Sequence, residues 1–418
     1  MSERIIIDFE DDERKKKNKP DDERIIIEFD KTEEKIEIDE IEESYERKIL
    51  KSKINSSYRG NAGINNYFES DLKFPEGIEK GFRLKFSLNL EDDFYNSILE
   101  NNRFIILSSG KGNIYLVDKF TGKINEKIFF ENESFEKTGV VFENTIYLNS
   151  LKRIYELNKT GISKREIYYS EDKYYIWSSL NRLNDNLVFI KHNPAENYSA
   201  VTVIELMNNC NIKEFKFECR NYVSDSICIA DRKAYVLFDG KILEYDFDKN
   251  SGEIYTLDID TDESSLLFYS NRRLYVTTCL NELYYLDIPP MKYGFKYSGI
   301  KNVYINSAGG FEDNIFIGTM DGWKCYKTSG LLVFGFEDET ENKIEALCKN
   351  MMIVSKKNKI VFCNLNRFQE AEGFVISSDK ADDSVEIVSA VISGNEIVAL
   401  TQSGHLYVYT NDKLNIHI

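Results

Sequence analysis

The sequence predicts an all-β fold: a single β-propeller of about eight four-stranded blades, preceded by an acidic N-terminal arm. Three observations support this expectation. From about residue 82 onward, the chain contains short apolar runs rich in Ile, Val, Tyr and Phe, bounded by Gly, Asn and Asp. The runs come in pairs joined by a turn, which is the pattern of a β-hairpin. The pairs recur about every 40 residues, the length of one propeller blade.

Eight hairpins follow one another along the chain, and each is expected to supply the two central strands of a blade. In the first, Phe104 to Ser109 and Ile114 to Asp118 flank the turn Gly110 to Asn113. Weaker strand candidates between the hairpins, such as Phe94 to Leu99 and Ile124 to Phe130, supply the inner and outer edges. The other seven hairpins begin near residues 145, 187, 234, 274, 315, 352 and 397. Eight hairpins imply eight blades, and seven blades is the alternative.

The ring must also close, because an open propeller leaves an exposed sheet edge. We expect the outer strand of the last blade to come from Leu84 to Leu90 or from Leu414 to Ile418. A helical solenoid has repeats of similar length, but its helices need runs of about ten or more residues with helical periodicity. The runs of this chain are shorter and rich in β-branched and aromatic residues, which favours strands.

Residues 1–80 differ from the rest of the chain, because charge dominates and aromatic side chains are sparse before Tyr67 and Phe68. Such a segment buries too little apolar surface to offset the entropy of ordering. We therefore predict a mostly disordered acidic arm over residues 1–80 and a propeller over residues 81–418.

The arm contains one phrase twice, ERIIIDFE at residues 3–10 and ERIIIEFD at residues 23–30. Its β-branched residues favour a strand, and the flanking acids oppose self-aggregation. We interpret the copies as linear motifs that add a strand to the sheet edge of a partner protein. The predicted partner-binding residues are Ile5, Ile6, Ile7, Phe9, Ile25, Ile26, Ile27 and Phe29. A duplicated tail without a receptor is the alternative interpretation.

Composition argues against several classes of function. The formal net charge of −17 disfavours nucleic-acid binding, which needs clustered Lys and Arg. No stretch is long and apolar enough to span a bilayer and no export signal is visible, so we expect a cytoplasmic protein without membrane insertion.

The seven cysteines form no Cys-x-x-Cys pair, and His192, His405 and His417 lie in no metal-binding spacing. We predict reduced core thiols and no metal site.

One stretch resembles a known repeat. Residues 109–123, SGKGNIYLVDKFTGK, are similar to the blade repeat of the pyrroloquinoline-quinone-like propellers: a Gly-containing turn, an apolar strand ending in Asp, then Thr-Gly-Lys. Degenerate copies occur at residues 319–322 and 403–409. The resemblance implies a propeller fold but not the quinone site, because the dehydrogenases stack the quinone on an indole and bind calcium through carboxylates. This chain has only Trp177 and Trp323, and we expect a non-enzymatic member without a cofactor.

We predict no catalytic residues, because no spacing of nucleophile, base or phosphate-binding loop stands out. The acidic run Asp258 to Glu263 is expected to be a solvated loop, with a Ca²⁺ site as the alternative. Tyr168, Tyr169 and the stretch Tyr174 to Trp177 flank charged loops and are candidates for a protein-binding surface. The expected function is a non-catalytic scaffold with protein partners in a multi-subunit complex. The alternative is an enzyme, such as a glycan hydrolase or lyase, with its site in the central channel.

Overall fold

The computed structural model describes residue 68 and residues 82–410, apart from 102, 143–144, 159–162, 172, 258, 281, 289–295, 298–304, 338–339, 350, 357–358, 366–368 and 376–385. For residues 4–5, 27–28, 54–56, 296–297, 305–306 and 369–375 only the strand is described. The chain divides into two compact units, Met1–Lys53 and Ile54–Ile418. Every regular element in the described residues is a strand.

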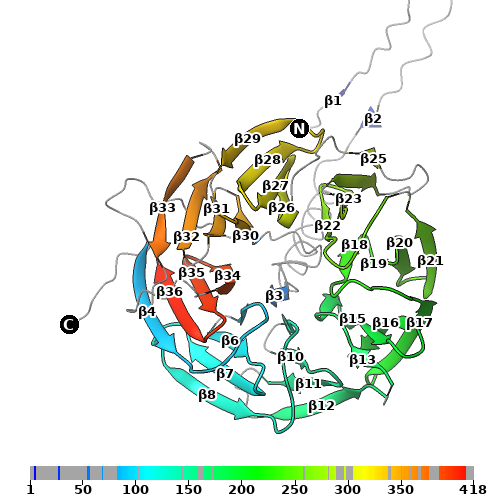
Figure 1. Cartoon of the computed structure of the whole chain (residues 1–418). Coiled ribbons are helices and arrows are strands. Elements are labelled where there is room, and N and C mark those ends of the chain that lie inside the picture. The colour runs from blue at the N-terminus through cyan, green and yellow to red at the C-terminus, as the bar shows by residue number, and fades with distance from the viewer. Residues whose placement is uncertain are drawn as a thin grey trace, which may run out of the picture. The chain divides into compact units, whose positions relative to one another are not determined.

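The unit Ile54–Ile418 is a ring of eight small antiparallel sheets, which confirms the predicted eight-bladed propeller (Figure 1). Blades are numbered in chain order, and their strands are given from the centre outward. Blade 1 consists of β5 (Leu99–Glu100), β6 (Phe104–Ser108), β7 (Asn113–Asp118) and β8 (Ile124–Phe129). Blade 2 consists of β9 (Val140–Phe142), β10 (Thr145–Asn149), β11 (Arg153–Leu157) and β12 (Lys164–Tyr169). In blade 3, β13 (Tyr175–Ile176) and β14 (Asn181–Leu183) both pair with β15 (Asn186–Asn193), followed by β16 (Tyr198–Glu205) and β17 (Asn211–Glu218).

The remaining blades have the same plan. Blade 4 consists of β18 (Cys228–Ala230), β19 (Lys233–Phe238), β20 (Lys241–Asp246) and β21 (Ser251–Thr256). Blade 5 consists of β22 (Leu267–Ser270), β23 (Arg273–Thr277), β24 (Leu283–Asp287) and β25 (Lys296–Tyr297). Blade 6 consists of β26 (Ile305–Phe311), β27 (Asn314–Thr319), β28 (Gly322–Lys327) and β29 (Leu332–Glu337). Blade 7 consists of β30 (Lys343–Cys348), β31 (Met351–Lys356), β32 (Lys359–Asn364) and β33 (Gln369–Val375), and blade 8 of β34 (Ile387–Ser393), β35 (Glu396–Thr401), β36 (His405–Thr410) and β4.

Strand β4 (Arg83–Asn89) closes the ring, because it comes from the N-terminal side and forms the outer strand of blade 8. It pairs antiparallel with β36, with Leu88 opposite Leu406. Phe86 and Leu88 pack against the core between blades 8 and 1, and Lys85 pairs with Glu396 on β35. Of the two predicted closures, the one from Leu84 to Leu90 is confirmed. The other, Leu414 to Ile418, lies outside the described residues.

The core is distributed between neighbouring blades. The second strand of each blade is almost wholly buried, whereas outer strands such as β8 and β29 alternate between exposed and half-buried residues. Seven clusters of apolar side chains fill the contacts from one blade to the next within the described residues. Each blade therefore buries its faces only against its two neighbours, as expected for a repeat architecture.

None of the seven cysteines forms a disulfide bond. The predicted core location is confirmed for Cys219, Cys228, Cys325, Cys348 and Cys363, which are buried. Burial raises the pKa of Cys219 to about 11, so its thiol stays protonated near neutrality. The prediction is wrong for Cys279, which is exposed in the turn between β23 and β24, and Cys210 is half-buried.

Two buried tyrosines differ in the bonding of their hydroxyls and predict opposite mutational effects. The hydroxyl of Tyr235 has no hydrogen-bond partner among the described residues, whereas Tyr115 donates to Asp92 Oδ2 at 3.0 Å. Because an unsatisfied buried hydroxyl is costly, we expect Tyr235→Phe to raise the free energy of unfolding by about 1 kcal/mol and Tyr115→Phe to lower it by about 1–2 kcal/mol. Urea unfolding of both variants tests this, and a destabilised Tyr235→Phe would contradict it.

Candidate functional site at the channel mouth

One face of the propeller gathers two kinds of loop around the central channel. Because strands alternate in direction, the connections from one blade to the next end on the same face as the turns between the second and third strands. We call this the channel-mouth face. It is formed by loops such as residues 90–98, 130–139, 219–227 and 257–266 and by turns such as 150–152.

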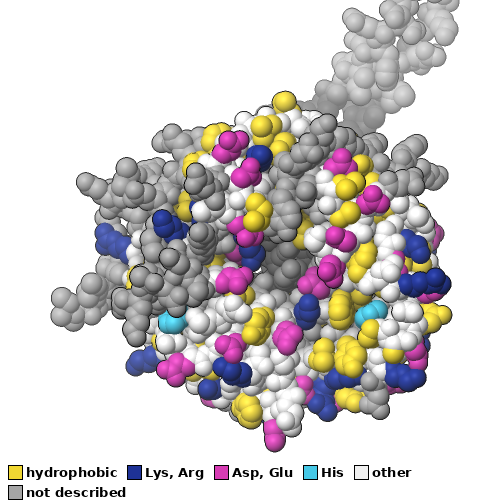
Figure 2. Space-filling model, viewed as in Figure 1, with side chains coloured by type: hydrophobic (Ala, Val, Ile, Leu, Met, Phe, Trp, Pro, Cys, Tyr) yellow, Lys and Arg dark blue, Asp and Glu magenta, His cyan; other side chains and the backbone are white. Residues whose placement is uncertain are grey.

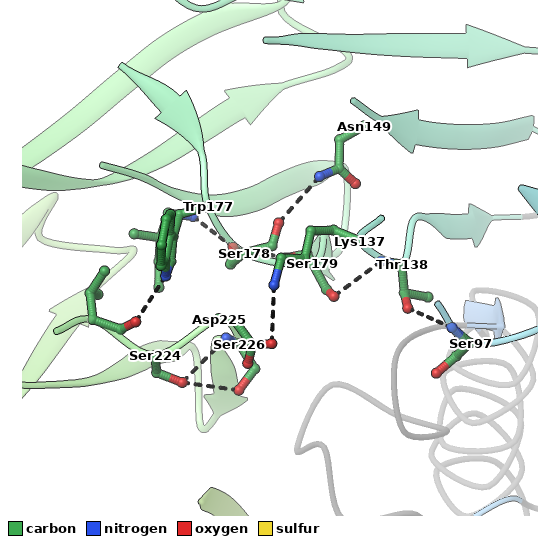
Figure 3. A network of polar contacts seen from close by, with 12 residues as sticks. Ser97, Lys137, Thr138, Asn149, Trp177, Ser178, Ser179, Ser224, Asp225 and Ser226 are labelled. Carbon is green, nitrogen blue, oxygen red and sulfur yellow. Dashed lines mark hydrogen bonds and ion pairs between the residues drawn. The ribbon is translucent and has the colours of Figure 1, made fainter. Parts of the chain in front are cut away.

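A polar residue stands just before or at the start of the innermost strand of every blade. The residues are Ser97, Thr138, Ser179, Ser226, Ser265, Ser307, Glu345 and Ser389. Several link neighbouring blades: the Ser97 N–H donates to Thr138 Oγ1 at 3.0 Å, and the Thr138 N–H donates to Ser179 Oγ at 3.2 Å (Figure 3). The Ile98 N–H donates likewise to Ser389 Oγ at 3.3 Å across the closing point of the ring. These bonds join adjacent blades beside their innermost strands.

This ring of polar residues was not predicted from the sequence. The signal was a Ser or Thr recurring about every 40 residues before each hairpin except that of blade 7, where Glu345 takes its place. Serine and threonine are common in any loop, so without the structure nothing separates this series from ordinary turn residues.

A polar cavity of about 190 Å³ lies inside the ring. Lys137 Nζ is 3.2 Å from Asp225 Oδ2, an ion pair that reaches from blade 2 to blade 4 past Ser179 of blade 3 (Figure 3). Lys343 Nζ is 3.4 Å from Glu345 Oε1 in the same wall. Two of the cavity's three carboxylates are thus paired with lysines, and a facing pair of unpaired carboxylates, which glycoside hydrolysis requires, is not found in the described part of the wall.

The chain before the propeller also contributes to the channel. Strand β3 (Ile54–Ser56) pairs with β9 and so adds a fifth strand to the central edge of blade 2. The Phe68 N–H donates to the Leu347 carbonyl of β30 at 2.7 Å, and the Phe68 ring packs against the cores between blades 7 and 8 and between blades 8 and 1. Both segments fall within residues 1–80, and the compact unit that contains the propeller begins at Ile54.

The two copies of the duplicated phrase pair with each other in the unit Met1–Lys53. Strand β1 (Arg4–Ile5) lies antiparallel to β2 (Ile27–Glu28), with Ile5 opposite Ile27 and Arg4 opposite Glu28. Sequence reasoning missed this pairing, although an Arg before and an acid after the isoleucines set opposite charges across an antiparallel pair. The other predicted partner-binding residues, Ile6, Ile7, Phe9, Ile25, Ile26 and Phe29, lie outside the described residues, as does the predicted disorder of most of the arm.

The predicted aromatic surface is brought together in part. Trp177 is 39% exposed, and its indole Nε1–H donates to the Val223 carbonyl at 2.9 Å, which holds the ring on the channel-mouth face (Figure 3). Leu151, 55% exposed, lies beside it, since its carbonyl accepts from the Ile176 N–H at 2.8 Å. Tyr168, in contrast, is buried between blades 2 and 3, while Tyr169 is exposed on the outer strand β12.

Lysine side chains cover the other two predicted aromatic residues. Lys152 Nζ lies 4.1 Å from the ring centre of Tyr175, and Lys191 Nζ lies 4.6 Å from that of Tyr174. These contacts are cation–π interactions, which leave both rings half-buried. Trp177 is therefore the main exposed aromatic side chain of the stretch.

The acidic run of blade 5 is a hydrogen-bonded turn. Asp262 Oδ1 accepts from the Ser264 N–H at 2.9 Å, while Asp258 lies outside the described residues. No group of three or more His, Cys, Asp or Glu side chains in the described residues is arranged to hold a metal ion. Likewise, no helix capable of crossing a membrane is found in that part of the chain.

Comparisons with known proteins show the fold. No protein-family model matches the sequence, and no curated protein matches it either. Among solved structures, a europium-containing methanol dehydrogenase is similar with a TM-score of 0.63 and 9% identity, covering 86% of this chain and 98% of that one.

BamB from Moraxella catarrhalis has a TM-score of 0.56 and 11% identity, with 79% of this chain and 100% of that chain covered. Sqt1 from Saccharomyces cerevisiae has a TM-score of 0.58 and 11% identity, with 79% and 99% covered. At these identities the similarity concerns architecture alone. The chain therefore has the β-propeller architecture of these proteins, the fold that the repeat in its first blade implied.

Proposed function

We propose that the protein is a non-catalytic interaction scaffold, whose channel-mouth face binds one protein partner while the Ile and Phe motifs of the arm dock another by strand addition. One observation carries the proposal: large apolar side chains from five blades are exposed on that face. They are Tyr95, Leu151, Trp177, Leu280 and Met320. Tyrosine and tryptophan dominate the energetics of protein interfaces because they bury a large area at a small entropic cost.

The channel itself favours a binding role over catalysis. Its lysines are paired with Asp225 and Glu345, and its hydroxyls accept hydrogen bonds from neighbouring backbones. Strand β3 and Phe68 occupy positions on the inner strands where a deep substrate site would lie. The exposed apolar groups stand around this channel, on a surface that suits a protein rather than a small molecule.

The arm fits a second docking role. A two-stranded sheet keeps one unpaired edge on each strand, and an unpaired edge can accept a further strand from another protein. Two binding elements on one chain raise overall affinity through effective concentration. The proposal includes the cytoplasmic location and the multi-subunit complex expected from the sequence.

Affinity capture from native lysate tests the scaffold with matched variants. We expect Leu151→Ser/Trp177→Ser to lose one set of bound proteins at least about tenfold, since interface anchors contribute about 2 kcal/mol or more. We expect Ile6→Lys/Ile26→Lys in the arm to lose a different set. Met207→Ser is the control, because Met207 is 83% exposed in a turn of the opposite face. Equal recovery of the same proteins by all variants would exclude both docking surfaces.

A further inference from the structure

Charge is distributed unequally between the two faces of the propeller. The described loops of the channel-mouth face contain the acids Glu91, Asp92, Asp93, Glu131, Glu133, Glu136, Glu171, Glu196, Asp225, Asp239, Asp260, Asp262, Glu263, Glu282, Asp321, Glu341 and Glu386, against the bases Lys111, Lys137, Lys152, Lys173 and Arg220. The described loops of the opposite face contain Asp185, Asp231, Asp248, Glu312 and Asp313, against Arg103, Lys119, Lys123, Arg232, Lys249, Arg272 and Lys349. Among the described loops, the excess of acidic side chains therefore lies on the channel-mouth face.

The loop of blade 4 links the exposed Trp177 to the acidic loop of blade 5. Trp177 is bonded to Val223, which stands two residues before Asp225 in the loop of blade 4. In the same loop, the Tyr222 hydroxyl contacts the Thr261 hydroxyl of blade 5, between Asp260 and Asp262. We call the set Leu151, Trp177, Asp225, Asp260 and Glu263 the Trp177 surface. Figure 2 shows acidic and hydrophobic side chains interspersed around the centre of the face in view.

The carboxylates of the Trp177 surface differ in their pairing. Asp225 is half exposed and has Lys137 Nζ at 3.2 Å. Asp260 and Glu263 are exposed and form no ion pair with any residue that the structure describes. Two uncompensated carboxylates and an exposed indole on the same face attract cations in two ways, by charge and, at the ring, through the cation–π interaction.

We propose that the Trp177 surface binds a basic segment of a partner protein, in which several Lys or Arg side chains surround at least one large apolar side chain. This inference rests on the scaffold function proposed above and names the partner class of the same face. The apolar side chain covers Leu151 and Trp177, while the cations meet Asp260, Glu263 and Asp225. Charge complementarity makes the surface selective for a basic partner. It also speeds association, because the acids of the face attract the cations of the partner before the two proteins touch.

A displayed library of random 12-residue peptides, selected on the full-length protein, tests the chemistry directly. We expect the selected peptides to be rich in Arg and Lys with an apolar residue among them. For the tightest such peptide, Trp177→Ser should weaken binding about tenfold or more, and Asp260→Lys/Glu263→Lys by a similar factor. Raising the salt concentration from about 0.05 M to about 0.3 M should weaken binding severalfold, because exposed charges are screened.

The control Met207→Ser/Glu312→Lys makes the same kinds of change on the opposite face and should leave the affinity unchanged. Peptides that depend on Trp177 but lack basic residues would overturn the inferred partner class and leave the scaffold function standing. Selected peptides that bind all variants equally would overturn the Trp177 surface as a basic-peptide site. The scaffold function fails separately, if the native proteins captured by the full-length chain do not change with Leu151→Ser/Trp177→Ser.

Discussion

A chain that begins at residue 91, and so lacks β4, is expected to lose the native propeller, whereas a chain that begins at residue 54 keeps it. Without β4, strand β36 has an unpaired edge and the core between blades 8 and 1 loses Phe86 and Leu88. An open ring exposes both the edge and the apolar faces of its end blades. The expected loss of about 5 kcal/mol or more is comparable to the whole stability of a typical domain.

Thermal unfolding followed by circular dichroism, together with size-exclusion chromatography, measures this effect. Because the shorter chain also lacks β3 and Phe68, a full-length variant separates the contributions. Phe86→Asp/Leu88→Asp places two charges in the core side of β4, while the control Leu84→Asp changes a residue that is 48% exposed. Similar melting temperatures for Phe86→Asp/Leu88→Asp and Leu84→Asp would show that β4 does not hold the ring closed.

The sequence predicted the elements whose cause is local. Each hairpin has its two apolar runs and its turn within about 20 residues, so pattern alone locates strands such as β6 and β7. The closing strand was narrowed to two candidates by the rule that a propeller leaves no open edge. Composition and sequence pattern were sufficient to predict the propeller, because every blade is built from the same four-stranded repeat.

Features that depend on a distant partner were not predicted. Phe94 to Leu99 was expected to be a strand, yet only Leu99–Glu100 is one. The preceding residues turn away from the sheet, because the Phe94 N–H donates to the Gln402 carbonyl at 3.0 Å and Asn96 Nδ2 donates to the Phe135 carbonyl at 2.9 Å. Both partners belong to neighbouring blades, and no local pattern encodes them.

The candidate site, like the fold, was predicted only where its cause is local in the sequence. The stretch Tyr174 to Trp177 was recognised from its composition, but composition does not show which ring is covered. The structure selects Trp177, because Lys152 and Lys191 lie over the neighbouring tyrosines. The charge difference between the two faces could not be predicted from the sequence either, since it depends on which loops of the eight blades lie on the same face.

Replacing Asp92 should strongly lower the stability of the protein. Asp92 is 3% exposed in the loop from β4 to β5, and its Oδ2 accepts from Asn113 Nδ2 at 2.8 Å and from the Tyr115 hydroxyl at 3.0 Å. Its Oδ1 accepts from the Asp93 N–H at 2.9 Å. Asp92→Ala leaves the buried Tyr115 hydroxyl and the half-buried Asn113 and Asp93 donors without this acceptor at the closing point of the ring. We expect the free energy of unfolding to fall by about 3 kcal/mol at neutral pH, measured by urea unfolding.

The same carboxylate predicts a pH dependence. Burial alone would raise the pKa of Asp92, but hydrogen bonds from Asn113, Asp93, Ser109 and Tyr115 outweigh burial and hold this pKa below its ordinary value of 3.8. A lowered folded-state pKa stabilises the fold above the unfolded value, and the stabilisation disappears as the pH falls through the folded pKa. The free energy of unfolding of the wild type should therefore fall below about pH 4 more steeply than that of Asp92→Asn, which cannot titrate.

The control for this comparison is Asp260→Asn, which removes an exposed carboxylate of the same face. Asp260 forms no ion pair with the described residues. Its replacement should therefore leave the free energy of unfolding close to that of the wild type, both at neutral pH and as the pH falls below about 4. If the free energy of unfolding falls equally with pH below about pH 4 in Asp92→Asn and Asp260→Asn, the Asp92 network does not stabilise the junction of blades 8 and 1. Closure of the ring would then depend on β4 and its apolar side chains alone.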